Sequence, residues 1–260
     1  MKIKILVATH KLANMPKDLD LYLPILVGAS RNWHENINFQ RDDMGDNISD
    51  KNPNYNELTA AYWAWKNLND VDAIGLVQYR RYLAPKRSVG SANVLRQSQI
   101  EKMLTNYDLI LPKKRRYYIE TNYTHYVHAH HSEPLDQTRE IVKEQYPGYL
   151  KSFDHVMKMR SAHMFNMFVM KKNIFDNYCE WMFGILNKLE ARIDVSQYSS
   201  QEARAFGYIS ELLMDVWVEK NHIKYTETPW IQLGGKHTFR KIFFFVGRKF
   251  NIGVRKTHFE

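Results

Sequence analysis

The chain has 260 residues, of which 44% are hydrophobic and 25% are charged. These proportions are typical of a globular protein with a buried core, and they exclude a disordered or fibrous chain. The formal net charge is +9, and the single cysteine, Cys179, excludes an internal disulfide bond and favours a reducing compartment.

The first element in chain order is KIKILVATHK, which predicts a buried strand that ends at Thr9. Ligands of open α/β sheets bind beyond the carboxyl ends of the strands, so His10 and Lys11 are candidate ligand contacts. Residues 12–56 are rich in polar side chains and show few helical patterns, particularly in RDDMGDNISDKNPNYN. We interpret this stretch as a long ordered loop, and such loops in compact domains are usually functional.

A helix and a strand follow that loop. NELTAAYWAWKNL predicts an amphipathic helix, and the apolar run at 73–77 predicts a buried strand followed by QYRRY. If the strand continues, alternation places Arg80 and Arg81 on opposite sides, so at least one of them faces the ligand crevice. Guanidinium groups bind phosphate oxygens bidentately. The alternative interpretation is one surface arginine and one structural arginine.

The remaining pattern alternates strands and helices. Strands are predicted at 107–112, at 161–170 and in IKYTETP, and helices are predicted after residue 171 and at 202–219. This alternation favours an α/β fold with a mainly parallel central sheet flanked by helices, in a single domain at 1–235. In the helix at 202–219, Glu211 lies away from the apolar face, where its carboxylate is either a general base or part of a solvated surface.

Residues 236–260 form a basic, phenylalanine-rich tail with seven lysines and arginines against Glu260 alone. Phenylalanines between cations suit an anionic membrane surface, and the alternative is a final helix that packs on the domain. Nucleic acid is disfavoured as a partner because the aromatic residues form an apolar run rather than separate stacking platforms. No segment resembles a signal peptide or a membrane span, so we expect a cytoplasmic protein that is peripheral to the membrane.

Motifs of several enzyme classes are absent. The chain has no GxGxxG, P-loop or GxSxG pattern, so a dinucleotide fold, a P-loop enzyme and a serine hydrolase lose their usual support. Two Asp-x-Asp pairs start at Asp18 and Asp70, and the second precedes its strand, so we interpret it as a turn rather than a metal site. Four histidines lie between 125 and 131 without metal-ligand spacing, and we select His128 as a candidate substrate contact.

The string GDNISDKNPNYNELTAAYWAWKN, followed by IGLVQYRRYL, resembles a family of polysaccharide-locus glycosyltransferases that was once catalogued as a domain of unknown function. Members of that family are assigned as galactofuranosyltransferases of capsule, exopolysaccharide and O-antigen assembly. ATHK, HMFNMFVMKK, YCEWMFGIL and GYISELL match in the same order, so the resemblance extends to about residue 230. Two positions depart from the family pattern, because Gln78 stands where a histidine is usual and Leu212 where an arginine is usual.

The resemblance implies a GT-A-like fold, a UDP-galactofuranose donor, a lipid-linked saccharide acceptor and inversion at the anomeric carbon. It implies Glu211 as the base and Arg80 or Arg81 as the diphosphate clamp. The expected donor and substrate contacts are His10, Lys11, Asp46, Asn47, Lys51, Asn52, Glu57, Trp63, Lys66, Tyr79, His128 and Asn166. The sequence leaves open a divalent cation (Mg²⁺ or Mn²⁺). It also leaves open a pyranose donor, a basic binding module and a catalytically silent scaffold.

Overall fold

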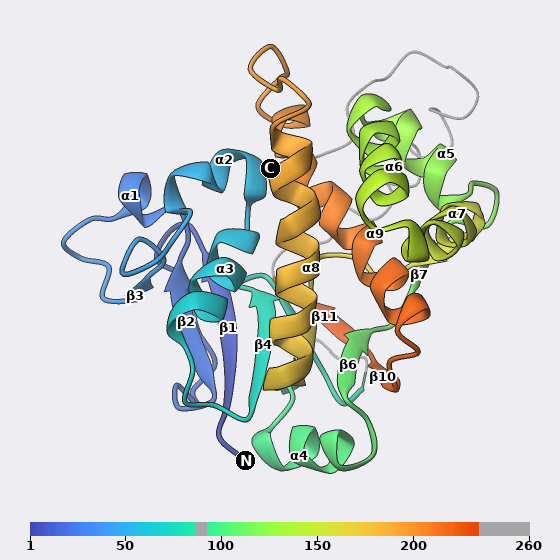
Figure 1. Ribbon diagram of the computed structural model, residues 1–260. Coiled ribbons are helices and arrows are strands. Elements are labelled where there is room, and N and C mark those ends of the chain that lie inside the picture. The colour runs from blue at the N-terminus through green and yellow to red at the C-terminus, as the bar shows by residue number, and fades with distance from the viewer. Residues whose placement is uncertain (87–92, 234–260) are drawn as a thin grey trace.

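The computed structural model describes residues 1–86 and 93–233 (Figure 1). Within these residues one sheet has nine strands, in the order β10, β6, β9, β4, β1, β2, β3, with β5 beside β4 and β11 beside β5. Its strands are β1 (Ile3–Thr9), β2 (Tyr22–Leu26), β3 (Gln40–Arg41), β4 (Ala73–Gln78), β5 (Arg81–Leu83), β6 (Leu109–Pro112), β9 (Phe168–Lys171), β10 (Tyr225–Thr228) and β11 (Trp230–Gln232). A separate ribbon pairs β7 (Arg115–Arg116) with β8 (Ser161–Ala162).

The strand directions decide where a ligand can bind. β1 is parallel to β2 and β4, β2 is parallel to β3, and β10 is parallel to β6, whereas β9 is antiparallel to both β4 and β6. Most strands of the sheet therefore end at the same edge, the upper one in Figure 1, which we call the carboxyl edge. The opposite edge is the amino edge. The expected α/β fold with a mostly parallel sheet is confirmed, with β9 as the central antiparallel exception.

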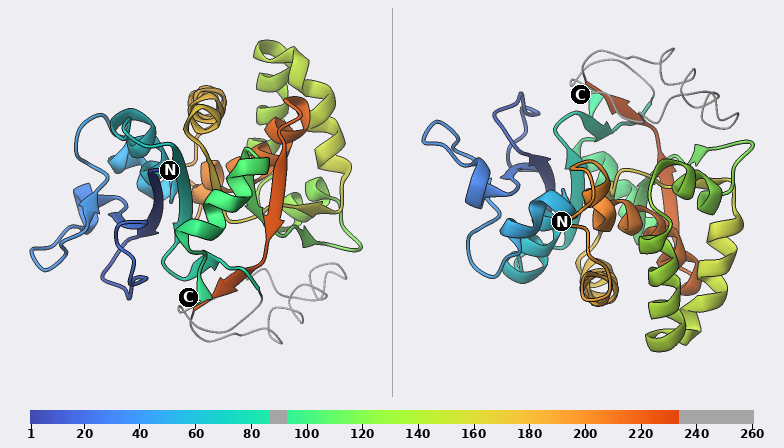
Figure 2. Two further views of the ribbon diagram at one scale, coloured as in Figure 1. Left: turned by 90° about the horizontal axis from the view of Figure 1, so that it is seen from below. Right: turned by 90° about the horizontal axis from the view of Figure 1, so that it is seen from above.

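Helices cover both faces of this sheet. They are α1 (Ala29–Asn32), α2 (Asn52–Tyr55), α3 (Leu58–Asn67), α4 (Gln97–Asn106), α5 (Asn122–Ala129), α6 (Glu133–Gln145), α7 (Leu150–Lys158), α8 (Lys172–Glu190) and α9 (Ala205–Lys220). Side chains of β1 alternate between two cores: Leu6 and Ala8 pack with α3, α8 and α9, whereas Ile5 and Val7 pack with α4 and the β5–β11 pair. Figure 2 shows α8 and β11 on opposite faces of the sheet.

The helices α5, α6 and α7 form a layer outside α9 and α8, on the right in Figure 1. The buried face of α7 contains Phe153, Val156 and Met157, which join the same core as α9. This layer places the β7–β8 ribbon and the histidine-rich α5 beyond the end of β6. Among the described residues no helix combines the length and the apolar character that crossing a bilayer requires.

Two expectations from the sequence were wrong in detail. The stretch at 12–56 contains β2 and β3 rather than only loop. The strand in YLPIL was not predicted because Pro24 cannot donate a ladder hydrogen bond, and proline therefore argues against a strand. The strand at 161–170 is interrupted because Phe165 and Asn166 adopt left-handed backbone angles, with φ of 79° and 52°. The tail at 236–260 lies outside the described residues, so its membrane contact stays a prediction.

Candidate functional site

The candidate site lies at the carboxyl edge, where the chain leaves β1 and β4 and approaches β9. His10 follows β1, Tyr79 follows β4, and their rings meet edge to face with centroids 5.6 Å apart. The Arg80 guanidinium carbon lies 4.9 Å from the centre of the Tyr79 ring. Two strand ends thus bring an imidazole, a phenol and a guanidinium together, as expected for the ligand side of an α/β sheet.

The left-handed turn before β9 holds the site in place. The Gln78 side-chain amide donates a hydrogen bond to the carbonyl oxygen of Phe165 over 3.1 Å and accepts one from Arg81. The Arg81 guanidinium carbon lies 4.5 Å from the centre of the Phe165 ring. The backbone N–H of Phe165 in turn donates to the carboxylate of Glu211. One strained turn therefore positions both a cation and a carboxylate.

Asn166 connects three elements around this turn. Its amide nitrogen donates to Oε1 of Glu57 over 2.9 Å and to the carbonyl oxygen of Gly207 over 3.1 Å. Its amide oxygen accepts a hydrogen bond from the hydroxyl of Ser210 over 2.8 Å. Asn166 is only 7% exposed, so these bonds are protected from water. The start of α3 and the first turn of α9 are thereby fixed to β9.

Gly207 permits the close approach of these elements. A Cβ atom at this position would lie 2.2 Å from Nδ2 of Asn56, closer than any real contact. Asn56 itself has a positive φ of 54°, and its Oδ1 accepts a hydrogen bond of 2.7 Å from Nε of Arg204. The absence of a side chain at residue 207 therefore allows the segment before α3 to bring Glu57 against α9.

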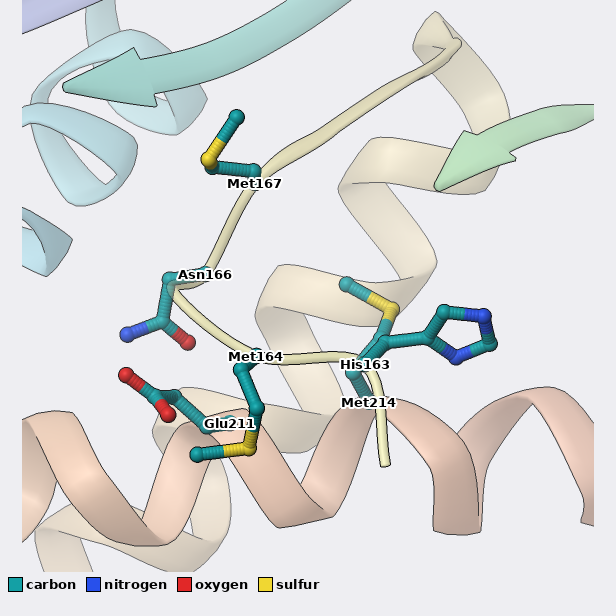
Figure 3. A pocket seen from close by; sticks show the side chains of 6 residues that line it. All are labelled: His163, Met164, Asn166, Met167, Glu211 and Met214. Carbon is teal, nitrogen blue, oxygen red and sulfur yellow. The ribbon is translucent and has the colours of Figure 1, made fainter. Parts of the chain in front are cut away.

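Glu211 is the most perturbed carboxyl group at this edge. Its side chain points toward Asn166 and Met164 (Figure 3), and it lines a cavity of about 10 Å³, the size of one water molecule. Burial, followed by the charge of Glu57, raises the pKa of Glu211 to about 8. The Phe165 N–H and the charges of Arg81 and Arg115 oppose that rise. The carboxyl group is accordingly mostly protonated at neutral pH.

Cations surround the two carboxyl groups. Burial lowers the pKa of Arg81, and the charges of Glu211 and Glu57 counter it. Burial also lowers the pKa of His10, and so do the nearby charges of Lys11, Arg80 and Arg204. Repulsion among neighbouring cations is unfavourable in the absence of an anion, so this cluster is suited to bind one.

Arg81 has a side-chain hydrogen-bond donor with no acceptor among the described residues. Its Nε atom is buried, and within the described residues it has no hydrogen-bond partner. Arg80 is exposed and projects into solvent beside it. A phosphate group bound beside the two guanidinium groups would offset the repulsion between them.

Of the residues selected from the sequence, several gather in a cluster around these cations, which we call the candidate cleft, and others lie elsewhere. Those in the cleft are His10, Lys11, Glu57, Tyr79, Arg80, Arg81, Asn166 and Glu211. Asp46 bonds to Asn67 at the far end of α3, and Asn47 bonds within its own loop. Because α3 has ten residues, its two ends are about 15 Å apart. Lys66, over the Trp65 ring at 3.4 Å, also lies near the far end.

The other selected residues have structural partners. Lys51 forms an ion pair of 2.6 Å with Glu190 of α8, and Asn52 packs under Gly28 beyond β2. Trp63 is 7% exposed and belongs to the core. His128 bonds through Nδ1 to Glu120 over 2.8 Å, on α5. Leu212 is buried in the core of α9.

The fold adds to the candidate cleft several residues that were not selected from the sequence. Arg204 lies just before α9, Phe165 provides the turn, and Arg115 lies on β7. Behind them, the buried His163 bonds to Asp215 over 2.5 Å and to Glu227 over 3.1 Å. Burial raises the pKa of Asp215, but the hydrogen bond with His163 outweighs it and the net shift is downward. Only Asn166, a polar residue between apolar runs, could have signalled the turn.

Metal ligands are not grouped in the described part of the chain. No set of three His, Cys, Asp or Glu side chains in residues 1–86 and 93–233 is placed to hold an ion. Asp18 accepts a hydrogen bond of 3.0 Å from the Leu21 N–H, and Asp72 accepts one of 2.7 Å from the Lys2 N–H. Both Asp-x-Asp pairs therefore form turns at the amino edge.

Comparisons with known proteins agree with the fold. The model of DUF4422, a domain of unknown function, matches residues 4–222. A solved apo structure of the bifunctional glycosyltransferase WbbM superposes with a TM-score of 0.81 at 31% sequence identity, covering 90% of this chain and 46% of that one. This chain thus spans about half the length of WbbM. A search of curated proteins gave no match.

Proposed function

The chain belongs to the DUF4422 family, and we propose that it is a glycosyltransferase that transfers galactofuranose from UDP-galactofuranose to a lipid-linked saccharide in the synthesis of a bacterial surface polysaccharide. The observation that carries the proposal is the cation cluster of the cleft beside a carboxyl group of raised pKa. The likeness to WbbM, whose description names it a glycosyltransferase, supports the reaction class. The galactofuranosyl donor and the acceptor rest on the family resemblance of the sequence.

In the proposed reaction the arginines hold the diphosphate of the donor. Arg80 and Arg81 lie after β4, and Arg204 approaches from α9, so the three guanidinium groups can contact the phosphate oxygens from two sides. As the bond between the anomeric carbon and the diphosphate oxygen breaks, negative charge grows on UDP. Cations already in place stabilise that charge without reorganisation.

Glu211 takes the proton in this mechanism. The acceptor hydroxyl oxygen attacks the anomeric carbon, its proton passes to the Glu211 carboxylate, and UDP departs from the opposite face with the electron pair of the broken bond. Attack opposite to the leaving group inverts the anomeric centre. A carboxylate whose pKa is about 8 is a stronger base than an ordinary one, although only a minority is ionised at neutral pH.

Gln78 is a positioning residue in this scheme. Its amide accepts from Arg81 and donates to Phe165, and both bonds need a donor and an acceptor rather than a titrating group. A neutral histidine offers the same pair of functions. The departure from the family pattern at this position therefore leaves the proposed chemistry intact, because proton transfer is assigned to Glu211.

A donor screen tests the function. Full-length protein is incubated with a synthetic lipid-linked saccharide and either UDP-galactofuranose or UDP-galactopyranose, and the product is identified by mass and by anomeric NMR couplings. We expect transfer from the furanose donor with inversion. Transfer only from the pyranose donor would refute the donor, and UDP binding without any transfer would refute the enzymatic proposal.

A further inference from the structure

The β7–β8 ribbon carries a basic surface, of which Arg115 also lies near Glu211 of the candidate site. Arg115 pairs with Ala162 and Arg116 with Ser161, and the chain then continues through Tyr117 to Glu120 (Figure 1). We call the segment 113–120, together with Lys158 and Arg160, the basic ribbon. It continues directly from the carboxyl end of β6, so it lies at the same edge of the molecule as the cleft.

Exposed positive charge predominates on the ribbon: of the neighbouring carboxylates Glu227 is exposed and paired with His163, whereas Glu120 and Asp215 are buried. The exposed cations are Lys113, Arg115, Arg116, Lys158 and Arg160. Glu120 is 4% exposed and is bound by His125 and His128, and Asp215 is 4% exposed and is bound by His163. The surface that faces solvent is therefore strongly cationic and suits a polyanionic partner.

An aromatic side chain stands among these cations. Tyr118 is 74% exposed, and the adjacent Ile119 is 49% exposed. Tyr118 also has a positive φ of 58°, and the Arg160 guanidinium donates a hydrogen bond of 3.1 Å to its carbonyl oxygen. Left-handed backbone is costly for a bulky residue, yet here the fold maintains it with the ring in solvent. Burial of that ring against a partner would recover hydrophobic free energy.

We propose that the basic ribbon docks on the surface of an anionic phospholipid bilayer, with Tyr118 at the headgroup boundary and the surrounding cations on lipid phosphates. Exposed aromatic and aliphatic side chains among lysines and arginines are the combination that binds such a surface. A single-stranded nucleic acid would require successive aromatic platforms along a groove, and the ribbon exposes its aromatic ring at one tip. The proposal rests on charge and exposure and is independent of the sugar donor.

Vesicle binding tests this docking without any turnover. Full-length protein is sedimented with phosphatidylcholine vesicles that contain or lack phosphatidylglycerol. The variant Lys113→Gln with Arg116→Gln should bind the anionic vesicles about thirtyfold more weakly, since each cation near such a surface contributes about 1 kcal/mol. The matched control is Lys17→Gln with Lys102→Gln, which removes two exposed cations away from the ribbon, and it should remain within about twofold of the unchanged protein.

Site-specific labelling gives a second measurement that does not depend on removing charge. Cys179 is buried, so a polarity-sensitive dye on Tyr118→Cys labels residue 118 selectively. Its emission should shift to the blue with anionic vesicles, whereas the dye on Leu19→Cys should not respond. Undiminished binding of the Lys113 and Arg116 variant, an unresponsive dye at residue 118, or tighter binding of a single-stranded oligonucleotide than of vesicles would each overturn the proposal.

Discussion

The two edges of the sheet differ in how their charged side chains are paired. At the amino edge Asp70 pairs with Lys2, and Asp72 accepts a hydrogen bond from the Lys2 N–H. At the carboxyl edge cations face one another around two carboxyl groups, and Phe165, Asn166 and Asn56 have positive φ. Balanced charge and relaxed turns stabilise a fold, whereas unbalanced charge and strained turns are typical of sites that bind a ligand. This contrast indicates that the carboxyl edge is the one that binds a ligand.

Among substitutions at the two edges, removal of the proposed base at the carboxyl edge should have the largest effect on activity. Glu211→Gln keeps the shape of the side chain but cannot accept a proton, so kcat should fall about a thousandfold. The affinity for UDP, measured by calorimetry, should remain within about twofold. The amino-edge control Asp70→Asn removes a carboxylate that is 94% exposed and should leave both quantities unchanged. Unaltered turnover of Glu211→Gln would remove this residue from the mechanism.

The arginine clamp should have the next largest effect. Arg81→Ala removes a charged donor of the proposed phosphate site, and the Kd for UDP should rise at least about tenfold. Arg80→Ala should weaken UDP binding by a smaller factor because that side chain is exposed to solvent. Lys2→Ala is the matched loss of a cation at the amino edge. Normal UDP binding by both arginine variants would contradict the clamp.

Gln78 offers a finer test of positioning. Gln78→Leu breaks the bonds to Arg81 and Phe165, so kcat should fall about tenfold while KM for the donor changes less. Gln78→His can accept one bond and donate the other, and it should recover most of the activity. Equal loss in the two variants would indicate that the volume of the side chain, rather than its hydrogen bonds, is what the site requires.

The pH dependence should give the smallest but most diagnostic effect. Because Glu211 must be ionised to act as a base, kcat should rise with pH up to about 8 and then level. Stability moves the other way: a pKa raised in the folded state means that the protonated form stabilises the fold, so this contribution is lost as pH rises from the ordinary glutamate range through about 8. Melting temperatures of Glu211→Gln should show a weaker decline over that range.

The sequence predicted the elements with strong periodicity. β1, β4 and the long α8 were expected from continuous apolar runs or a complete apolar face, and the model places them as expected. The interruption before β9 escaped prediction because HMFNMF reads as an apolar run, and only the local backbone reveals that Phe165 and Asn166 turn. β2 escaped because it is short and contains a proline.

The candidate site was foreseen where residues follow strand ends. His10, Arg80 and Arg81 belong to that class, and the strand directions explain why they lie close together. Asp46 and Lys66 were expected in the donor pocket alongside the family resemblance, and α3 places them at its far end. Arg204 and Arg115 come from segments remote in sequence, and only the packing of α9 and the β7–β8 ribbon brings them to the cleft.

Asn166 has a consequence for the order in which the molecule assembles. Its hydrogen-bond partners Glu57 and Ser210 are 109 and 44 residues away along the chain. Contacts of such long range form only after the intervening loops have closed. A growing chain on the ribosome would therefore have no complete cleft until α9 had been synthesised and had docked. Incomplete chains would therefore lack the site that is proposed to bind the sugar donor.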